Sequence, residues 1–495
     1  MKTIQNPKYI LTVCSVIFFI IYSYLAFISP DKFVSPDEVA NYHFTQLYAQ
    51  TGELRYTENL NDIAQGIIHP RGAVYTDGYV TSAKFLGFQV VNGTSAVIIP
   101  DFIRFLTPFL AIIGALFFYL LIRDMFNPKI ALLSYLLLLV LPIYWYWSSL
   151  SMFENIAGCA MIIISFRYFF LLFKSSKVSY FVLFGLFYGL ALFIRPDFIF
   201  LAIPIGIITL WNIKKIKQVN LIWAFIAFLM SFGPFLTLNN LLYGSPLTTG
   251  QHVQYGITQT LIGAEFSIGN LLTNSHNLIN LMPVLFMCTL FGIILRVKKC
   301  GIKSNYLAFS VIGLIALSLY YLDDKVIETS IHISYGRYLL PISILFIPLF
   351  SYFIIKFQNK IIPTILIFSI VILNILTVVP VIDSNQKSVE GYATLSQIVV
   401  DTTETDAVIF LDYWDKAIFP ERRVAIVGEL PSDNLDKTFF NITIKLYDKG
   451  LRVYIYFKVE LTELVAKETM DDLFLSSGYQ LQETDVKDLY KLTEQ

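Results

Sequence analysis

Apolar segments long enough to cross a lipid bilayer recur through the first 380 residues, and they constrain the fold of this chain more than any other feature. A hydrocarbon core of about 30 Å is crossed by roughly 20 apolar residues in a helix. Hydrophobic residues make up 56% of the 495 residues and charged residues only 15%, which is typical of a polytopic membrane protein. We predict about eleven membrane spans, near residues 9–28, 102–122, 130–148, 155–173, 178–194, 197–213, 218–241, 278–295, 304–322, 338–355 and 361–380.

Lysine and arginine are concentrated in every second connection between these spans. The basic connections hold 15 Lys and Arg, including Lys2 and Lys8, whereas the short connections and the 241–277 loop on the opposite side hold three. Because basic residues near span ends stay on the cytoplasmic side, the N-terminus is predicted to be cytoplasmic. The first apolar run, from Tyr9 to Ile28, is long for a signal peptide and is interpreted as an uncleaved anchor.

Two adjacent carboxylates follow the first span, in the stretch Ser35-Pro36-Asp37-Glu38. Burying charge near hydrocarbon is costly, so acidic residues at a membrane surface usually lie in a wet functional cavity. A proline followed by two acidic residues also suits the first turn of a helix. Asp37 and Glu38 are therefore candidate functional residues, with helix capping as the alternative.

The other polar segments fall on the same predicted outer side, at residues 29–101, 149–155, 195–197, 242–277 and 323–337. A transporter would place its key polar groups at the membrane midplane, on interrupted helices. The polar groups of this chain gather at one interface instead. This pattern favours an enzyme that works at the outer membrane surface on a substrate presented by the lipid phase.

The composition changes after about residue 381, where the tail holds 21 Asp and Glu against 12 Lys and Arg. Residues 407–411, 424–427 and 453–457 are predicted strands, and residues 460–475 a helix. We predict a transmembrane domain at 1–380 and a small extracytoplasmic α/β domain at 381–495. The acidity of the tail argues against nucleic acid as a partner.

Cysteine and histidine give no metal motif. The four cysteines lie in or beside predicted spans without metal spacing or a disulfide pattern, and all five histidines fall outside the spans. A metal site built from histidine and carboxylates stays open, although no HExxH or similar spacing is present. No cofactor is predicted with certainty.

Five short stretches resemble, in order, the GT-C glycosyltransferases, the polyprenyl-phosphate-sugar-dependent group that includes protein mannosyltransferases and aminoarabinose transferases. The first combines Ser35-Pro36-Asp37-Glu38 with Tyr42 and Thr51-Gly52. The others are Met152-Phe153-Glu154-Asn155, Leu192-Phe193-Ile194-Arg195-Pro196, Tyr243-Gly244-Ser245-Pro246-Leu247 with Gly250, and Gly336-Arg337-Tyr338-Leu339-Leu340-Pro341. The resemblance covers roughly residues 1–380, and it implies a multi-span GT-C fold.

The resemblance implies an inverting transfer of a sugar from a dolichyl-phosphate or undecaprenyl-phosphate carrier to a protein, lipid or glycan acceptor. It makes Asp37 the base that takes the acceptor proton, with Glu38 beside it. Arg337, with Tyr338, would hold the lipid phosphate, because a guanidinium offers paired donors to phosphate oxygens. Arg195 is a second candidate for the phosphate, although a structural role in its outer turn is an equal alternative.

The acceptor or substrate side of the predicted site comprises Glu154, Tyr42, His69 and Arg71. Glu154 also suits the first turn of a helix, and Arg337 could be an interfacial arginine. Whether Glu38 and Glu154 hold a divalent metal is left open. The aromatic run Trp145-Tyr146-Trp147 is interpreted as an interfacial belt.

Two other functions compete with the transferase. A transporter or flippase for a lipid-linked substrate would also need many spans, but no paired halves are found. A non-catalytic binder of a lipid-linked sugar would lack Asp37, which is present. The plasma membrane of a prokaryote is the expected location, because no retention signal is evident. The donor sugar and the acceptor stay open.

Overall fold

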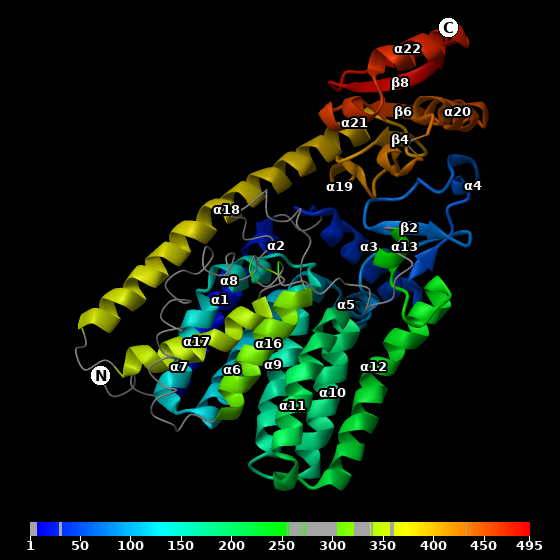
Figure 1. The fold of residues 1–495 in the computed structure, drawn as a ribbon. Helices are drawn as coiled ribbons and strands as arrows, with labels where there is room; N and C mark the ends of the chain where they lie inside the picture. The colour runs from blue at the N-terminus through cyan, green and yellow to red at the C-terminus, as the bar shows by residue number, and fades with distance from the viewer. Residues whose placement is uncertain are drawn as a thin grey trace. The chain divides into compact units, whose positions relative to one another are not determined.

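The computed structural model describes residues 7–28, 32–254, 304–320, 340–356, 361–431 and 433–495, together with Gly256, Gly269, Leu272 and Arg337 (Figure 1). The chain forms two compact units. One, called here the helical unit, comprises residues 1–28, 104–238 and 259–382. The other, called the sheet unit, comprises residues 29–103, 239–258 and 383–495.

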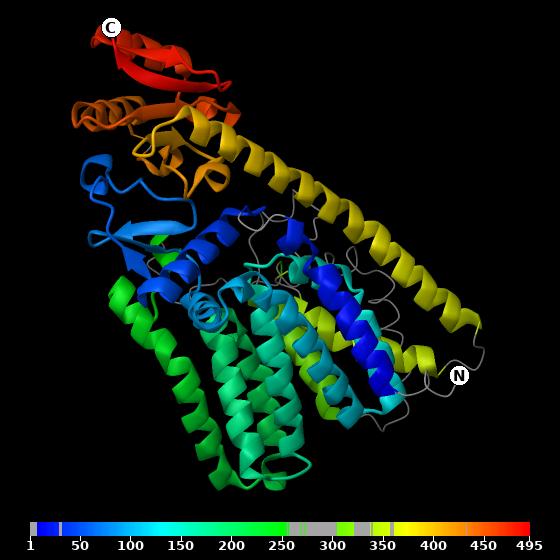
Figure 2. The same ribbon diagram turned by 180° about the vertical axis from the view of Figure 1, so that it is seen from behind.

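The helical unit is built from apolar helices. Among them, α6, α9 and α10 pack side by side (Figure 2). The elements are α1 (Pro7–Tyr22), α2 (Tyr24–Ile28), α6 (Leu106–Met125), α7 (Pro128–Leu139), α8 (Pro142–Ser149), α9 (Glu154–Leu172), α10 (Val178–Ile194), η3 (Pro196–Leu201), α11 (Ala202–Trp211), η4 (Ile213–Lys215), η5 (Gln218–Asn220), α16 (Ser304–Tyr320) and α17 (Leu340–Ile355). Two more helices, α12 (Leu221–Tyr243) and α18 (Ile361–Thr402), and the 3-10 turn η2 (Pro100–Arg104) contribute residues to both units.

Four of the described helices are long and apolar enough to cross a membrane, at Leu106–Met125, Glu154–Leu172, Gln218–Tyr243 and Thr364–Thr402. A fifth span is added if α7 and α8, which meet at an angle of 55°, form one broken span. Each predicted span coincides with a helix except the one near residues 278–295, which lies outside the described residues. The number of about eleven spans and their orientation stay predictions.

The helix that contains the last predicted span does not end near residue 380. Instead α18 continues to Thr402 through the composition change, with Pro380 inside it. Its polar half is supported by side-chain pairs four residues apart, such as Lys387 with Asp383 at 2.7 Å and Gln386 with Glu390 at 2.8 Å. The change in composition therefore marks a change of surroundings along one continuous helix.

Trp145, Tyr146 and Trp147 lie on α8 and are 8%, 7% and 2% exposed. The interpretation of these residues as an interfacial belt is wrong, because a belt residue faces lipid headgroups, whereas these side chains are buried within the protein. The ring of Trp145 packs edge-on against Phe18, 6.0 Å between ring centres. Aromatic composition alone did not distinguish the two environments.

The smaller sheet of the sheet unit has the antiparallel order β1-β3-β2. Its tightest turn joins β2 to β3 through Asp77 and Gly78, whose φ angles of 50° and 83° suit a two-residue hairpin turn. The strands are β1 (Arg55–Tyr56), β2 (Ala73–Thr76) and β3 (Tyr79–Ser82), and the helices around them are α3 (Pro36–Thr51), α4 (Asn61–Ala64), α5 (Leu86–Ile98) and α13 (Gly250–Gln254).

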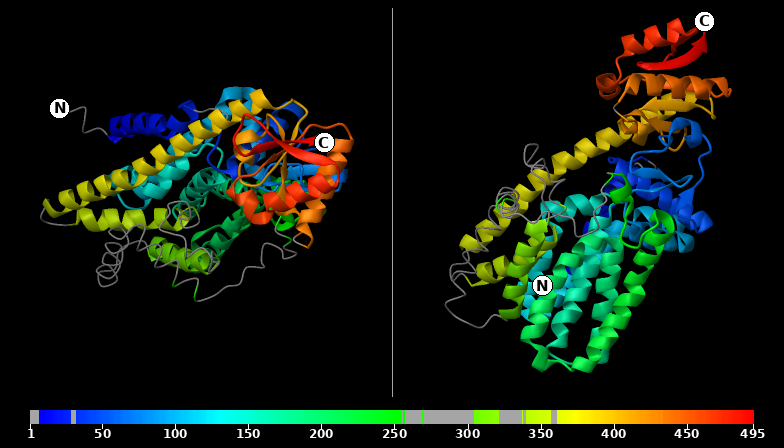
Figure 3. Two further views of the ribbon diagram at one scale, coloured as in Figure 1. Left: turned by 90° about the horizontal axis from the view of Figure 1, so that it is seen from above. Right: turned by 45° about the vertical axis from the view of Figure 1, so that its right-hand side comes forward.

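The larger sheet has the order β5-β4-β6-β8-β7, parallel at β5-β4-β6 and antiparallel at β6-β8-β7. The helix α22 packs on β7 and on α20, and α20 also contacts β6 (Figure 3). The elements are β4 (Val408–Leu411), α19 (Asp415–Ile418), β5 (Arg423–Ile426), η8 (Val427–Glu429), α20 (Leu435–Asp448), β6 (Val453–Tyr456), α21 (Val459–Leu464), α22 (Lys467–Ser476), β7 (Tyr479–Glu483) and β8 (Leu489–Glu494).

The three strands predicted in the tail are confirmed as β4, β5 and β6. The predicted helix at 460–475 is instead two helices, α21 and α22. The break falls at Val465, which has extended backbone and is fully buried in the core of the larger sheet. Burying this side chain therefore takes precedence over continuing the helix.

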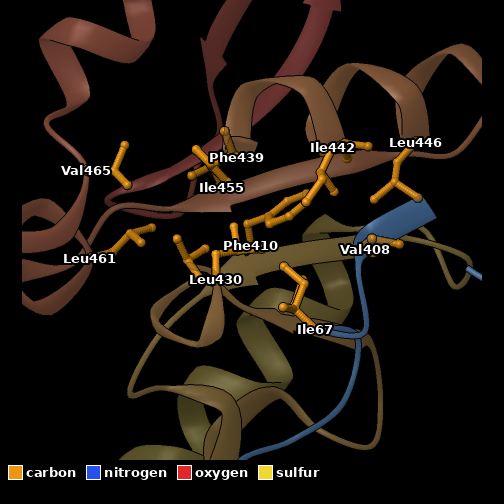
Figure 4. Packing of buried hydrophobic residues seen from close by; sticks show 14 of the residues in the cluster. Ile67, Val408, Phe410, Leu430, Phe439, Ile442, Leu446, Ile455, Leu461 and Val465 are labelled. Atoms are coloured by element: carbon orange, nitrogen blue, oxygen red, sulfur yellow. The ribbon is translucent and has the colours of Figure 1, made fainter. Parts of the chain in front are cut away.

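Residues of the first long loop complete the core of the larger sheet. Ala64, Ile67 and Ile68 are buried with strand residues such as Val408 and Phe410. Figure 4 shows Ile67 beside these two strand residues. The backbone N–H of Ile426 donates to the carbonyl of Ile67 at 3.0 Å, and Ile68 forms an antiparallel bridge with Ala425. The compact units thus differ from the predicted division at residue 380, which places the loop at 29–101 with the spans.

Candidate functional site

Asp37 lies in the first turn of α3, where the sequence explains its placement. Pro36 begins the helix, and the Oγ of Ser35 accepts a hydrogen bond from the N–H of Asp37 at 3.2 Å. Glu38 follows and is 2% exposed, whereas the side chain of Asp37 is 27% exposed. Pro36, Asp37 and Glu38 thus lie in the first turn of a helix, as the capping alternative expects, with Ser35 as its N-cap, while the carboxylate of Asp37 stays accessible.

Lys84 is the basic partner of Asp37. Its Nζ lies 2.8 Å from the Oδ1 of Asp37, and its side chain is only 8% exposed. A buried ammonium requires a carboxylate partner, so the pair fixes both groups. Gly72 makes the approach possible, because a Cβ at this position would lie 3.1 Å from the Cε of Lys84 and 3.0 Å from the Cβ of Ala40.

The stretch with Tyr243 and Gly250 packs on the backbone just before Lys84. The Oη of Tyr243 donates to the carbonyl of Ser82 at 2.6 Å. A Cβ on Gly250 would lie only 2.2 Å from the same oxygen, so only glycine fits there. These two residues of the family motif therefore position the segment that carries Lys84.

Tyr42, another predicted site residue, lies one turn beyond Glu38 on α3. Its ring packs at 5.0 Å from that of Phe33. Asp37, Glu38, Tyr42 and Lys84 are thus held by one helix and the end of one hairpin within the sheet unit.

His69 is buried and joined to the larger sheet of the same unit. Its Nε2 lies 3.2 Å from Oε2 of Glu429, and its Nδ1 lies 3.0 Å from the carbonyl oxygen of Pro70. Burial alone would lower the pKa of the imidazole, but the hydrogen bond and charge of Glu429 outweigh it and raise the pKa above the ordinary value. Both nitrogens face acceptors, which favours the protonated ring.

Arg71 is also bound to the larger sheet. Its Nη2 lies 2.7 Å from Oδ1 of Asp415, and its backbone N–H donates to Oδ2 at 2.9 Å. The guanidinium also donates to the carbonyl of Tyr413 and lies over the ring of that residue. Burial raises the pKa of Asp415 despite the charge of Arg71. His69 and Arg71 thus fasten the first loop to the larger sheet.

Arg195 and Asp197 form a local pair in the helical unit. Nη2 of Arg195 lies 2.8 Å from Oδ2 of Asp197, and their side chains are 4% and 7% exposed. Pro196 begins the 3-10 turn that brings them together. The positive charge of Arg195 is therefore neutralised within its own turn.

Arg337 lies on aromatic rings of the helical unit. Its guanidinium carbon is 5.4 Å from the ring centre of Trp147 and 5.9 Å from that of Phe153, and these rings meet edge-on at 4.7 Å. Glu154 follows Phe153, begins α9 and is 9% exposed. The structure thus brings Arg337 to the stretch that carries Glu154, while Tyr338 lies outside the described residues.

Two contributors to the site were missed from the sequence. Lys84 belongs to no quoted motif. A lone lysine directly after a predicted hairpin in an outer loop is the pattern that could have indicated it. Trp147 was missed because it lies in the aromatic run that was interpreted as an interfacial belt. In the described part of the chain, no group of three or more His, Cys, Asp or Glu side chains is placed to hold a metal ion.

A family model for dolichyl-phosphate-mannose-protein mannosyltransferases matches residues 99–237. Crystal structures of ArnT from Cupriavidus metallidurans match 98% of this chain and 97% of theirs. The one bound to undecaprenyl phosphate has a TM-score of 0.60 at 9% identity, and the apo one 0.58 at 10%. A structure of the Archaeoglobus fulgidus oligosaccharyltransferase tethered with an acceptor peptide also matches. The match covers 99% of this chain and 74% of the oligosaccharyltransferase chain, with a TM-score of 0.49 at 12% identity. No curated protein sequence matches. At such identities the ArnT match establishes a shared fold.

Proposed function

We propose that this chain, a membrane protein with the fold of the GT-C glycosyltransferases, transfers a sugar from a polyprenyl-phosphate carrier to an acceptor. The resemblance to this superfamily predicted from the sequence is confirmed by the family model and by the ArnT match. The observation that carries the proposal is the accessible carboxylate of Asp37, fixed in the first turn of α3 and paired with Lys84.

Asp37 is the proposed base. In the transfer, a carboxylate oxygen of Asp37 takes the proton of the acceptor hydroxyl. At the same time, the oxygen of this hydroxyl attacks the anomeric carbon. The bond between this carbon and the carrier phosphate breaks, and the phosphate leaves with the bonding electrons, so the anomeric configuration is inverted. A positioned carboxylate at the reacting oxygen suits this work, and the ammonium of Lys84 stabilises its charged form.

Arg337 is the proposed ligand of the leaving phosphate, with Tyr338 beside it in sequence. A guanidinium presents paired donors that match phosphate oxygens, and the rings of Trp147 and Phe153 support its position. Arg195 is already neutralised by Asp197. We therefore assign Arg195 to the positioning of its turn and leave the phosphate to Arg337.

Glu38, Tyr42 and Glu154 are proposed to contact the acceptor, which is a protein, lipid or glycan. A divalent metal held by Glu38 and Glu154 is an open part of the proposal. His69 and Arg71 act as positioning residues, because their side chains already join the first loop to the larger sheet. The proposed location is a prokaryotic plasma membrane, with a cytoplasmic N-terminus and an extracytoplasmic tail.

The test compares purified wild type with Asp37→Asn, using labelled polyprenyl-phosphate sugars and membrane extract as the acceptor source. Removal of a general base is expected to slow transfer about 10²–10⁴-fold. Donor binding is expected to be retained. The matched control is Asp77→Asn, because Asp77 is exposed in the β2–β3 turn at a φ of 50°, which asparagine adopts readily. This control should transfer sugar at the wild-type rate.

Two outcomes would remove the catalytic assignment. One is unchanged transfer in Asp37→Asn, and the other is failure of the wild type with every donor in the panel. Binding of a donor without transfer would then favour a non-catalytic binder, and movement of the intact donor between the leaflets of a reconstituted vesicle would favour a flippase. A melting temperature of Asp37→Asn close to that of the wild type would show that lost activity does not reflect unfolding.

A further inference from the structure

The sheet unit contains a cavity of about 150 Å³ that is lined by neither Asp37 nor Lys84. It lies where the first loop meets the segment that leads into β5. Its wall includes His43 from α3, Tyr56 and Glu58 from the loop, and Phe419, Arg422 and Arg423 from the tail. All of these residues belong to one compact unit.

His43 has a buried nitrogen that the protein leaves unsatisfied. Its ring is enclosed by Phe44, Tyr56 and Phe419, at 5.2, 5.4 and 4.8 Å between ring centres. Within the described ranges its Nε2 has no hydrogen-bond partner. An unsatisfied buried polar atom is costly and uncommon in a folded protein. A group that enters the cavity and bonds to this nitrogen accounts for its presence.

The ring of His43 brings hydrogen-bonding capacity to the cavity and no charge. Burial lowers its pKa from 6.5 to about 4, so the imidazole is neutral near pH 7. A neutral imidazole has one donor and one acceptor nitrogen. His43 can therefore bond to a hydroxyl or to an anionic oxygen without a repulsive charge.

Arginine makes the cavity wall positive. The guanidinium of Arg422 is buried and donates to Thr403 Oγ1 at 2.9 Å and to the carbonyls of Val400, Thr403 and Glu421. These are neutral acceptors, and among the described residues no carboxylate pairs with Arg422. Arg423 is neutralised by Glu58, with Nε and Oε2 separated by 3.2 Å. The wall thus keeps an uncompensated positive charge.

We infer that this cavity binds a small molecule bearing an oxyanion, a carboxylate or a phosphate, on a body no larger than about one monosaccharide. The volume admits such a body, while ordinary drug-sized sites run to roughly 300 Å³ or more. Arg422 supplies the net charge for the anion, Arg423 neutralises the carboxylate of Glu58 in the wall, and His43 and Tyr56 supply polar contacts beside apolar ring surface. His69, assigned above as a positioning residue, also lines this cavity, whereas Asp37, Glu38, Tyr42 and Lys84 do not.

The test uses the full chain in detergent, titrated calorimetrically with inorganic phosphate, glucuronate and glucose. We expect saturable binding of phosphate or glucuronate and none of glucose at the same concentrations. Binding of phosphate identifies a phosphate group as the natural anion, and binding of glucuronate alone identifies a carboxylated sugar. Added salt should weaken either interaction, because it screens the arginine charge.

Two variants probe the cavity wall and one serves as a control. His43→Phe keeps the aromatic packing and removes the ring nitrogens. Arg423→Gln leaves the carboxylate of Glu58 without this partner in the cavity wall, where its negative charge would repel an anion. Each is expected to weaken anion binding at least about tenfold, which corresponds to about 1.4 kcal/mol. The control is Lys387→Gln on α18, whose side chain is 73% exposed. It removes the same formal charge and should bind as the wild type does.

Stability separates loss of binding from loss of folding. His43→Phe should raise the melting temperature of the unliganded protein, because it removes an unsatisfied buried nitrogen, and should also lose the melting shift that the bound anion gives. The inference is overturned if neither anion binds saturably, which would leave the cavity to water. Equal binding of glucose, or anion binding that both variants leave unchanged, would overturn it as well.

Discussion

Arg71 and Asp415 are 344 residues apart and form a buried charge pair. The side chain of Asp415 is fully buried and that of Arg71 is 17% exposed. A buried pair contributes little to stability compared with an apolar pair, but loss of one partner leaves an uncompensated charge in the interior. The two residues therefore determine where the first loop is attached.

Arg71→Ala is predicted to lower the free energy of unfolding of the sheet unit by about 3–5 kcal/mol, because it leaves Asp415 unpaired. Urea-dependent proteolysis of the purified chain measures this. Lys387→Ala is the matched control, since it breaks an exposed pair with Asp383, and exposed pairs contribute little to stability. An equally small loss in Arg71→Ala would show that the pair is not needed to hold the loop.

The pair of His69 with Glu429 predicts a pH dependence. The pKa of His69 is higher in the folded chain than the usual 6.5, so the folded state holds the proton more tightly than the unfolded state does. The resulting stabilisation is fully present below pH 6.5 and is lost as the pH rises through the raised pKa of the folded state.

Replacement of His69 by glutamine should flatten the fall in stability above pH 6.5. The measurement is the melting temperature of wild type and His69→Gln in steps between pH 6 and pH 9. The control is His252→Gln. Burial lowers the pKa of His252, and its Nδ1 accepts a hydrogen bond from the N–H of Thr249. If His69→Gln keeps the wild-type slope, the pH dependence arises from other groups.

At the scale of elements, two glycines allow α10 to lie against α12. Gly185 and Gly189 are four residues apart, the small-residue spacing that lets membrane helices approach closely. A Cβ on Gly185 would lie 1.9 Å from the carbonyl oxygen of Ala224, and one on Gly189 would lie 2.1 Å from the Oγ of Ser231. The sequence carried this signal in the stretch from Phe184 to Gly189.

Gly185→Val is predicted to destabilise the helical unit by at least about 1–3 kcal/mol, the usual cost of overpacking. The matched control is Gly206→Val on α11, where a Cβ meets nothing within 4 Å. Thermal unfolding in detergent compares the two. If both variants lose a similar amount of stability, the effect comes from helix propensity. If neither loses stability, the close packing of α10 against α12 is contradicted.

Local signals predicted some elements well and others not at all. The strands β4 and β6 are continuous apolar runs and β5 is apolar after Arg423, so their own residues identify them. The strand β1 has only two residues and exists through its pairing with β3, and β7 is mostly exposed and pairs with the neighbouring β8, so neither has a clear apolar pattern of its own. The run from Trp145 to Trp147 was misplaced because composition does not show which surface covers a side chain.

At the scale of the whole molecule, the ordered motifs predicted a resemblance that the shared fold with ArnT supports, and Asp37 was proposed from the same motifs. Its partner Lys84 was not, because this salt bridge joins the end of the β2–β3 hairpin to helix α3 and so depends on how these two elements pack. His69 and Arg71 were singled out from the sequence, yet their partners Glu429 and Asp415 lie in the tail. Sequence position does not reveal such contacts.

The larger sheet is completed by residues from the first loop, so the tail should not fold well alone. A fragment of residues 383–495 lacks Ala64, Ile67 and Ile68, which belong to its core. We predict that this fragment binds a hydrophobic dye and unfolds without a sharp transition. Fusion of residues 54–83 through a flexible linker should restore a cooperative transition.

The control for the fragment experiment is the same fusion carrying Ile67→Asp. Ile67 is 2% exposed in the shared core, so a charge there prevents docking of the added segment. This fusion should behave like the bare fragment. A bare fragment that melts as sharply as the intact fusion would mean that the loop contributes no necessary part of the core.

The bridge between Ile68 and Ala425 has a consequence for the order of synthesis, because the ribosome makes the first residue 357 positions before the second. At roughly 5–20 residues per second this is a wait of roughly 20 to 70 s. During that time the two isoleucines at 67 and 68 have no sheet to cover them. Only a chain translated almost to its end can bury them, so a chain released early would keep this apolar segment exposed to chaperones and proteases.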